Sequence, residues 1–97
     1  MTFQLRDYRI DPKHLDEFLE AWRRQVPPLR REHGFEIQAW VMEEEVRLVW
    51  IVSYPGSRED FEEADAAYYA SSERRAFDPD PRQWLIETQH AWLNPVE

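Results

Sequence analysis

The residues of this 97-residue chain that could do chemistry lie mainly in segments of alternating hydrophobicity. His90 is the one histidine within such a segment that also has aromatic neighbours. An imidazole with an ordinary pKa of ~6.5 can act as a general base near neutral pH, so His90 is the candidate catalytic residue. Ligand pockets combine aromatic walls with a few polar groups. The candidate ligand-binding residues with this character are Arg6, Tyr8, Gln38, Trp40, Trp50, Tyr54, Thr88 and Trp92.

These residues also fit two structural interpretations. Trp, Tyr and Arg are enriched where protein chains meet, so the aromatic residues could simply fill an interface between two copies. His90 could be a buried histidine that is hydrogen-bonded to a neighbour, since no carboxylate stands where it would obviously orient the ring. The sequence therefore leaves a pocket and a filled interface as alternatives.

Other chemical signals in the chain are weak. His14 and Glu17 are three residues apart on a predicted helix, but no further His or Cys cluster could complete a metal site, so we expect a solvated helix face and no metal. There is no nucleophile elbow and no glycine-rich phosphate loop, which argues against common hydrolases, kinases and dehydrogenases, and no cofactor is expected. A possible basic stripe on the first helix, whose charges we expect to pair with neighbouring carboxylates, comprises Arg23, Arg24, Arg30 and Arg31.

Composition restricts the class of protein. The net charge is −8, whereas nucleic-acid binding requires a basic face, so no nucleic-acid partner is expected. The chain has no cysteine and therefore no disulfide or thiolate chemistry. No apolar run approaches the ~18 residues needed to cross a membrane, and the chain opens on an alternating strand rather than a signal segment. We expect a soluble cytoplasmic protein.

The first half of the chain reads as strand, helix, strand. Residues 3–10 alternate as a strand does, and Asp11-Pro12 is a typical helix start. Apolar residues then recur every three or four positions until Gly34, which is placed to end the helix. Pro27-Pro28 predicts a kink or restart within that helix, because proline lacks an amide donor. A second alternating strand is predicted over 35–42.

The second half repeats this order. A strand is predicted over 47–54, and a helix from Ser57 with a capping residue at Asp60. Residues 78–81 form a proline-rich loop, and the last strand covers 84–93. Two strand–helix–strand halves of this length predict an α+β, ferredoxin-like βαββαβ fold. We expect one domain over residues 1–97, with a four-stranded antiparallel sheet and the helices on one face.

Both faces of this predicted sheet are apolar. A sheet covered by helices on one side should be polar on the other. We expect the face away from the helices to carry Tyr8, Trp40, Trp50 and Tyr54. A second copy of the chain would then cover that face, which predicts a homodimer enclosing a pocket.

Several local motifs carry a family resemblance. The chain contains Leu5-Arg6-x-Tyr8, Asp11-Pro12-x-x-Leu15-x-x-Phe18-x-x-x-Trp22, Pro28-Leu29, His33-Gly34-Phe35, a strand with Trp50, and Tyr68-Tyr69-Ala70-Ser71. Together they resemble the NIPSNAP family of the dimeric α/β-barrel group over nearly the whole chain. Two departures are Gln4, in place of an acidic residue, and Asp-Pro in place of Pro-Gly after the first strand.

The resemblance implies a homodimer whose sheets pack face to face, and implies little about chemistry. Antibiotic-biosynthesis monooxygenases are similar in architecture, and in them a pocket with a Trp and a polar partner handles substrate and oxygen without a cofactor. We expect a protein that binds a small apolar or aromatic molecule between sheet and helices or at the dimer interface. The alternatives are a cofactor-independent monooxygenase or isomerase using His90 with Tyr8 or Arg6, and a purely structural homodimeric module.

Overall fold

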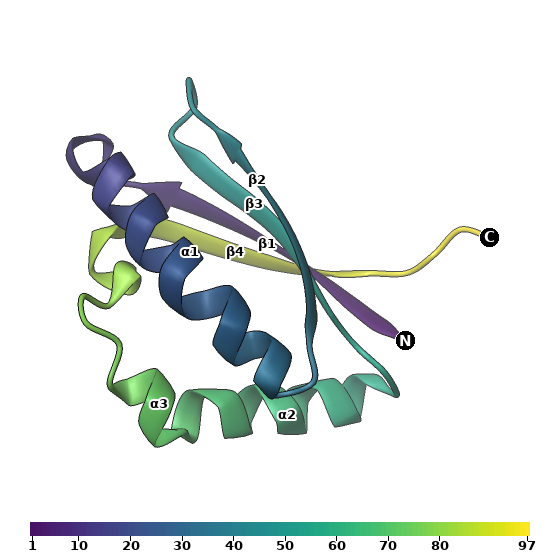
Figure 1. Ribbon diagram of the computed structural model, residues 1–97. Coiled ribbons are helices and arrows are strands. Elements are labelled where there is room, and N and C mark those ends of the chain that lie inside the picture. The colour runs from purple at the N-terminus through teal and green to yellow at the C-terminus, as the bar shows by residue number, and fades with distance from the viewer.

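The computed structural model describes residues 1–97, which form a twisted antiparallel sheet with the helices packed on one of its faces (Figure 1). The sheet has the strand order β2-β3-β1-β4. Its strands are β1 (Thr2–Ile10), β2 (Glu36–Met42), β3 (Arg47–Tyr54) and β4 (Leu85–Leu93). The helices are η1 (Pro12–His14), α1 (Leu15–Glu32), α2 (Arg58–Ala70), α3 (Ser72–Arg75) and η2 (Pro81–Trp84). The predicted α+β, ferredoxin-like fold is confirmed.

The helix starts follow the local sequence signals. The carboxylate of Asp11 accepts a hydrogen bond from the amide of Lys13 at the start of η1, 3.0 Å away. Ser57 and Asp60 form the reciprocal capping box of α2, in which each side chain bonds the backbone amide of the other. These bonds satisfy amides that have no partner within a helix.

The predicted restart at the two prolines is wrong, because α1 is a single helix through Pro27 and Pro28. The carbonyl groups that lose an amide partner are those of Arg23 and Arg24, four residues earlier, where the chain is exposed to water. Leu29 and Arg30 are buried, and their packing holds the last turn of α1 in place. As predicted, the chain reverses after the helix at Gly34, whose φ of 92° favours glycine.

Trp50 lies at the centre of the core between sheet and helices. Its ring packs edge-to-face against Trp22 of α1 and Tyr8 of β1, with centroid separations of 5.3 and 5.8 Å. Trp50 is 1% exposed. The expectation that Tyr8, Trp50 and Tyr54 lie on the face away from the helices is therefore wrong. Alternation identifies residues that share a face, but it does not say which face the helices cover when both are apolar.

The open face of the sheet has its own apolar side chains. Trp40 on β2 pairs with Val49 on β3, and Gln38 pairs with Ile51, so these four residues share the uncovered face with Leu5. Trp40 is 54% exposed. Both faces of the sheet thus carry apolar side chains, as predicted, although Tyr8, Trp50 and Tyr54 lie on the other face than expected. No helix of the chain has the length and hydrophobicity to span a bilayer.

Candidate functional site

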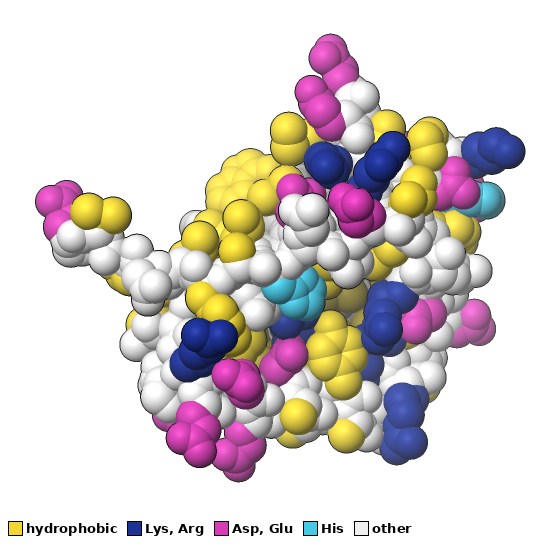
Figure 2. Space-filling model, turned by 180° about the vertical axis from the view of Figure 1, so that it is seen from behind, with side chains coloured by type: hydrophobic (Ala, Val, Ile, Leu, Met, Phe, Trp, Pro, Cys, Tyr) yellow, Lys and Arg dark blue, Asp and Glu magenta, His cyan; other side chains and the backbone are white.

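An open cleft of about 340 Å³ lies between β4 and the segments of α2 and η2 that face it. The side of the molecule seen in Figure 2 is hollowed near its centre, where a histidine lies beside basic and hydrophobic side chains. The residues that line the cleft are Tyr8, Tyr69, Arg82, Leu85, Thr88 and His90. A smaller inner cavity of about 20 Å³ shares four of these residues, Tyr8, Tyr69, Arg82 and Leu85, and has room for one water-sized group.

Beneath the cleft, Asp65 joins three elements of the fold. Its Oδ1 accepts hydrogen bonds from Nη2 of Arg6 on β1, at 3.2 Å, and from Nη1 of Arg30 on α1, at 2.6 Å. The hydroxyl of Tyr69 accepts from the same two guanidinium groups at 3.0 and 3.3 Å. Both arginine side chains are 1% exposed. We call Arg6, Arg30 and Asp65 the arginine cluster.

The arginine cluster contains two positive charges and one negative charge. Aromatic rings surround the cations, and a ring face attracts a guanidinium electrostatically. The Cζ atom of Arg30 lies 3.8 Å from the centroid of the Tyr68 ring, and Cζ of Arg6 lies 5.4 Å from that of Trp50. The amide oxygen of Gln4 accepts a 2.7 Å hydrogen bond from Nε of Arg6. These contacts satisfy the guanidinium groups in part, but the cluster keeps one excess positive charge.

The phenols beside the cluster do not cancel this charge. Burial raises the pKa of Tyr68 to about 12, despite the nearby cations Arg30 and Arg74. Burial likewise raises the pKa of Tyr8, with Arg6 acting in the opposite direction. Both phenols are therefore neutral at pH 7.

His90 lies directly opposite Arg6 in the pairing of β1 with β4, and its ring centroid is 6.4 Å from that of Tyr8. Partial burial lowers the pKa of His90, the cations Arg6 and Arg30 lower it further, and Asp65 acts in the opposite direction. The imidazole is consequently neutral at pH 7 and can accept a proton. His90 is exposed in the cleft, so it is not the buried core histidine that the sequence left open.

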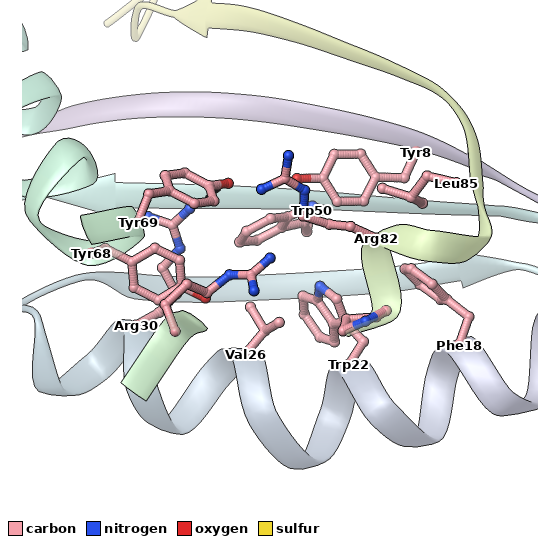
Figure 3. Close-up of a pocket in the computed structure, with 12 residues that line it drawn as sticks. Tyr8, Phe18, Trp22, Val26, Arg30, Trp50, Tyr68, Tyr69, Arg82 and Leu85 are labelled. Atoms are coloured by element: carbon pink, nitrogen blue, oxygen red, sulfur yellow. Dashed lines mark hydrogen bonds between the residues drawn. The ribbon is translucent and has the colours of Figure 1, made fainter. Parts of the chain in front are cut away.

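An ion pair beside the inner cavity positions η2, the element that carries Arg82. Nη1 and Nη2 of Arg74 lie 3.2 and 3.3 Å from the carboxylate oxygens of Asp80, which also accepts a hydrogen bond from the backbone amide of Arg82. This pair fixes η2 against α3. Figure 3 shows the phenol groups of Tyr8 and Tyr69 pointing toward one another, with the guanidinium of Arg82 between their hydroxyls in this view.

The predicted site residues divide into three sets. Tyr8, Thr88 and His90 line the cleft, with Arg6 and Trp50 behind them. Tyr54 and Trp92 pack in the core instead, against Phe35 and Phe61 at centroid distances of 5.0 and 5.1 Å. Gln38 and Trp40 lie on the opposite face of the sheet and are not part of this cleft.

Sequence reasoning missed four residues of the site, namely Arg30, Asp65, Tyr69 and Arg82. A signal for three of them was present. Arg30 follows Trp22 and Val26 at four-residue spacing on the buried stripe of α1, and it is not part of a solvated basic stripe. Asp65 and Tyr69 follow Phe61 at the same spacing on the inner face of α2. Polar residues on an apolar helix row mark a buried polar site.

His14 and Glu17 form an exposed contact, with 2.9 Å between Nδ1 and Oε2, and the ring of His14 stacks on Trp84. No group of three or more His, Cys, Asp or Glu residues could hold a metal ion.

Comparison with known proteins identifies the family. The NIPSNAP family model matches residues 3–97. The chain belongs to the NIPSNAP family. An uncharacterized NIPSNAP domain protein from Burkholderia xenovorans is 18% identical, with a TM-score of 0.85 over 99% of this chain and 95% of that one. A NIPSNAP family protein from Agrobacterium tumefaciens is 17% identical, with a TM-score of 0.85 over 99% and 93%.

A more distant similarity extends to an enzyme group. An antibiotic biosynthesis monooxygenase is 17% identical, with a TM-score of 0.76 over the whole of both chains. At this identity the similarity shows the shared fold and does not transfer an activity. No curated protein matches the chain. The function of this NIPSNAP protein therefore has to be argued from its own cleft.

Replacing Asp65 by Asn should destabilise the protein. The change keeps a hydrogen-bond acceptor but removes the charge that compensates two buried guanidinium groups, so the free energy of unfolding should fall by about 3 kcal/mol. Glu63→Gln removes the same charge from an exposed position of α2 and should change it by less than about 0.5 kcal/mol. Urea denaturation measures both values. Equal stability of the two variants would show that the carboxylate is not needed to hold the two arginines.

Proposed function

We propose that this NIPSNAP protein binds a small aromatic or apolar molecule in the cleft between β4, α2 and η2. The observation that carries this proposal is the composition of the cleft. Tyr8, Tyr69 and Leu85 offer apolar surface, while Thr88, His90 and Arg82 offer polar groups that converge on the same space. A volume of about 340 Å³ falls at the lower end of the range of small-molecule sites, which favours a ligand of one or two rings.

The open face of the sheet supports a separate proposal, that two copies of the chain associate through it. Trp40 is more than half exposed beside Val49, and Leu5 and Ile51 continue the apolar surface across the sheet. Exposed apolar patches of this kind mark interfaces, and Trp is enriched in them. This face is distinct from the cleft, so association would leave the ligand site open on the helix side. A purely structural homodimer would use only the open face.

One observation favours catalysis as a second function. His90 is a neutral imidazole in contact with the cleft, and such a group can take a proton from an acidic C–H or O–H of a bound molecule. Proton abstraction is the step that an isomerase or a cofactor-independent monooxygenase would require.

Ligand binding is tested by adding 2-naphthol, 2-naphthamide or 2-naphthoate to ¹⁵N-labelled protein. At least one probe should shift the amide signals of Tyr69, Leu85 and His90. Thr88→Trp should remove these shifts because the indole fills the cleft, whereas Thr88→Ser keeps the hydroxyl and should retain them. If no probe binds, or if Thr88→Trp leaves binding intact, the proposed cleft is not the ligand site.

Association is tested by analytical ultracentrifugation. The protein should sediment as a dimer, and Trp40→Asp should give monomers because it places a charge in the apolar open face. Ala66→Asp adds the same charge to the exposed side of α2 and should leave the dimer unchanged. A wild-type monomer, or a dimer that survives Trp40→Asp, would contradict the proposed interface.

Catalysis is tested with 2-tetralone, a bicyclic ketone with acidic C–H groups. In D₂O the protein should accelerate hydrogen exchange at these groups, as followed by proton NMR. His90→Ala should lose this acceleration, and His14→Ala, which changes an exposed histidine that does not line the cleft, should keep it. Because the lowered pKa keeps His90 unprotonated in mild acid, the rate should decline only below the pH at which an ordinary histidine is half protonated. Equal rates for the two variants would rule His90 out as the base.

A further inference from the structure

We propose that the ligand of the cleft carries a carboxylate, bound between the hydroxyl of Tyr69 and the guanidinium of Arg82 above the arginine cluster. This inference rests on the proposed function and specifies its ligand class. Three independent features of the site lead to it, namely the charge of the cluster, the shortage of acceptors and the free guanidinium at the mouth.

The first feature is charge. Arg6 and Arg30 are permanently protonated and share the single carboxylate of Asp65, so one positive charge under the cleft has no ionic partner. The nearby Arg74 and Asp80 already form their own pair. This excess of positive charge occurs in a chain whose net charge is −8, so it is a local property of the site. A buried positive charge without a partner favours an anion next to it.

The second feature is an imbalance between donors and acceptors. The Tyr69 hydroxyl has two acceptor lone pairs, and both receive N–H groups, from Arg6 and Arg30. Its hydrogen must therefore donate, yet no hydrogen bond of the chain has this hydroxyl as donor. Tyr69 borders both the cleft and the inner cavity, so a group bound where the two meet can supply the acceptor.

The inner cavity shows the same shortage. Among the buried side-chain atoms without any hydrogen-bond partner are Nε1 of Trp50, Nε of Arg30 and Nε of Arg74, and all three residues line this cavity. Each of these atoms is a donor. The region beneath the cleft thus holds three buried donors without acceptors, and a bound oxyanion adds acceptors next to it.

The third feature is Arg82. Its side chain is exposed, and no ion pair or side-chain hydrogen bond holds its guanidinium, because its hydrogen bonds use the backbone amide and the backbone carbonyl. The Cζ atom lies 5.6 Å from the centroid of the Tyr69 ring, on the border that the cleft shares with the inner cavity. Figure 3 places it beside the Tyr69 hydroxyl.

Two donors from two elements, α2 and η2, match the two oxygens of a carboxylate, and guanidinium groups bind carboxylates in a planar, directional manner. The ring system of the ligand would then lie along Tyr8 and Leu85 toward His90. An amide of the same shape offers one acceptor and brings an additional donor, so the site should discriminate against it.

The experiment compares 2-naphthoate with its neutral isostere 2-naphthamide by calorimetry at pH 7. Naphthoate should bind at least about tenfold more tightly, since hydrogen bonds to charged groups are the stronger ones. Arg82→Gln should weaken naphthoate binding by about tenfold and leave naphthamide binding unchanged. Arg75→Gln, which removes the same charge from an exposed position on α3, is the matched control and should bind both probes as wild type does.

A second readout is the pKa of His90, measured by NMR. The groups that act on His90 are Arg6, Arg30 and Asp65, together with the ring of Tyr8 beside it. A bound carboxylate offsets the effect of the two cations, so saturating naphthoate should raise the pKa of His90 and naphthamide should not.

The possible results separate the two proposals. Equal affinity for the two probes would overturn the carboxylate inference while leaving ligand binding in the cleft intact. If neither naphthoate nor naphthamide binds, this inference fails, and if 2-naphthol does not bind either, the proposed function fails with it. If Arg82→Gln binds naphthoate as well as Arg75→Gln does, Arg82 is not the carboxylate partner and the inference fails.

Discussion

The shared carboxylate of Asp65 is the contact on which the arrangement of sheet and helices depends. It links β1 to α1 and α2 through the guanidinium groups of Arg6 and Arg30, which are both excluded from water. Two like charges at this depth would repel one another strongly in a medium of low dielectric constant. The carboxylate removes that repulsion and sets the position of α2. Tyr69 lies one turn further along the same face of α2 and lines the cleft. The contacts of Asp65 therefore also position one wall of the cleft.

Such a cluster is a costly way to hold three elements together. Well-packed apolar residues of similar volume are often as stable as a buried ion pair, or more so. Apolar residues could not provide an excess positive charge beneath an open cleft. The same guanidinium groups that hold Asp65 also occupy the lone pairs of the Tyr69 hydroxyl, and thereby turn that hydroxyl into a donor. The same hydrogen-bond network therefore stabilises the fold and determines which ligand groups the site can bind.

The sequence predicts the fold well because its signals are local. The Ser57 capping box and the reversal at Gly34 each depend on a few adjacent residues. The side on which Trp50 lies could not be predicted, since its neighbours Val49 and Ile51 make the other face of β3 equally apolar. Arg30 was misread for a different reason. A charged residue suggests solvent, and the contacts that compensate its burial on the apolar stripe, such as the one with Asp65, are distant in sequence, here by 35 residues.

Successive side chains of β4 point to opposite faces of the sheet, so this strand contributes residues to both faces. Thr88 and His90 line the cleft, while Gln89 and Ala91 alternate with them on the open face that would meet a second copy. β4 is an edge strand that pairs only with β1, so it has backbone hydrogen bonds to one neighbouring strand, whereas each central strand has two neighbours. A second copy packed against its open side would restrict its motion and so fix the side chains that face the ligand. The proposed association and the proposed ligand binding would use opposite faces of the sheet, and β4, which has side chains on both faces, would couple them.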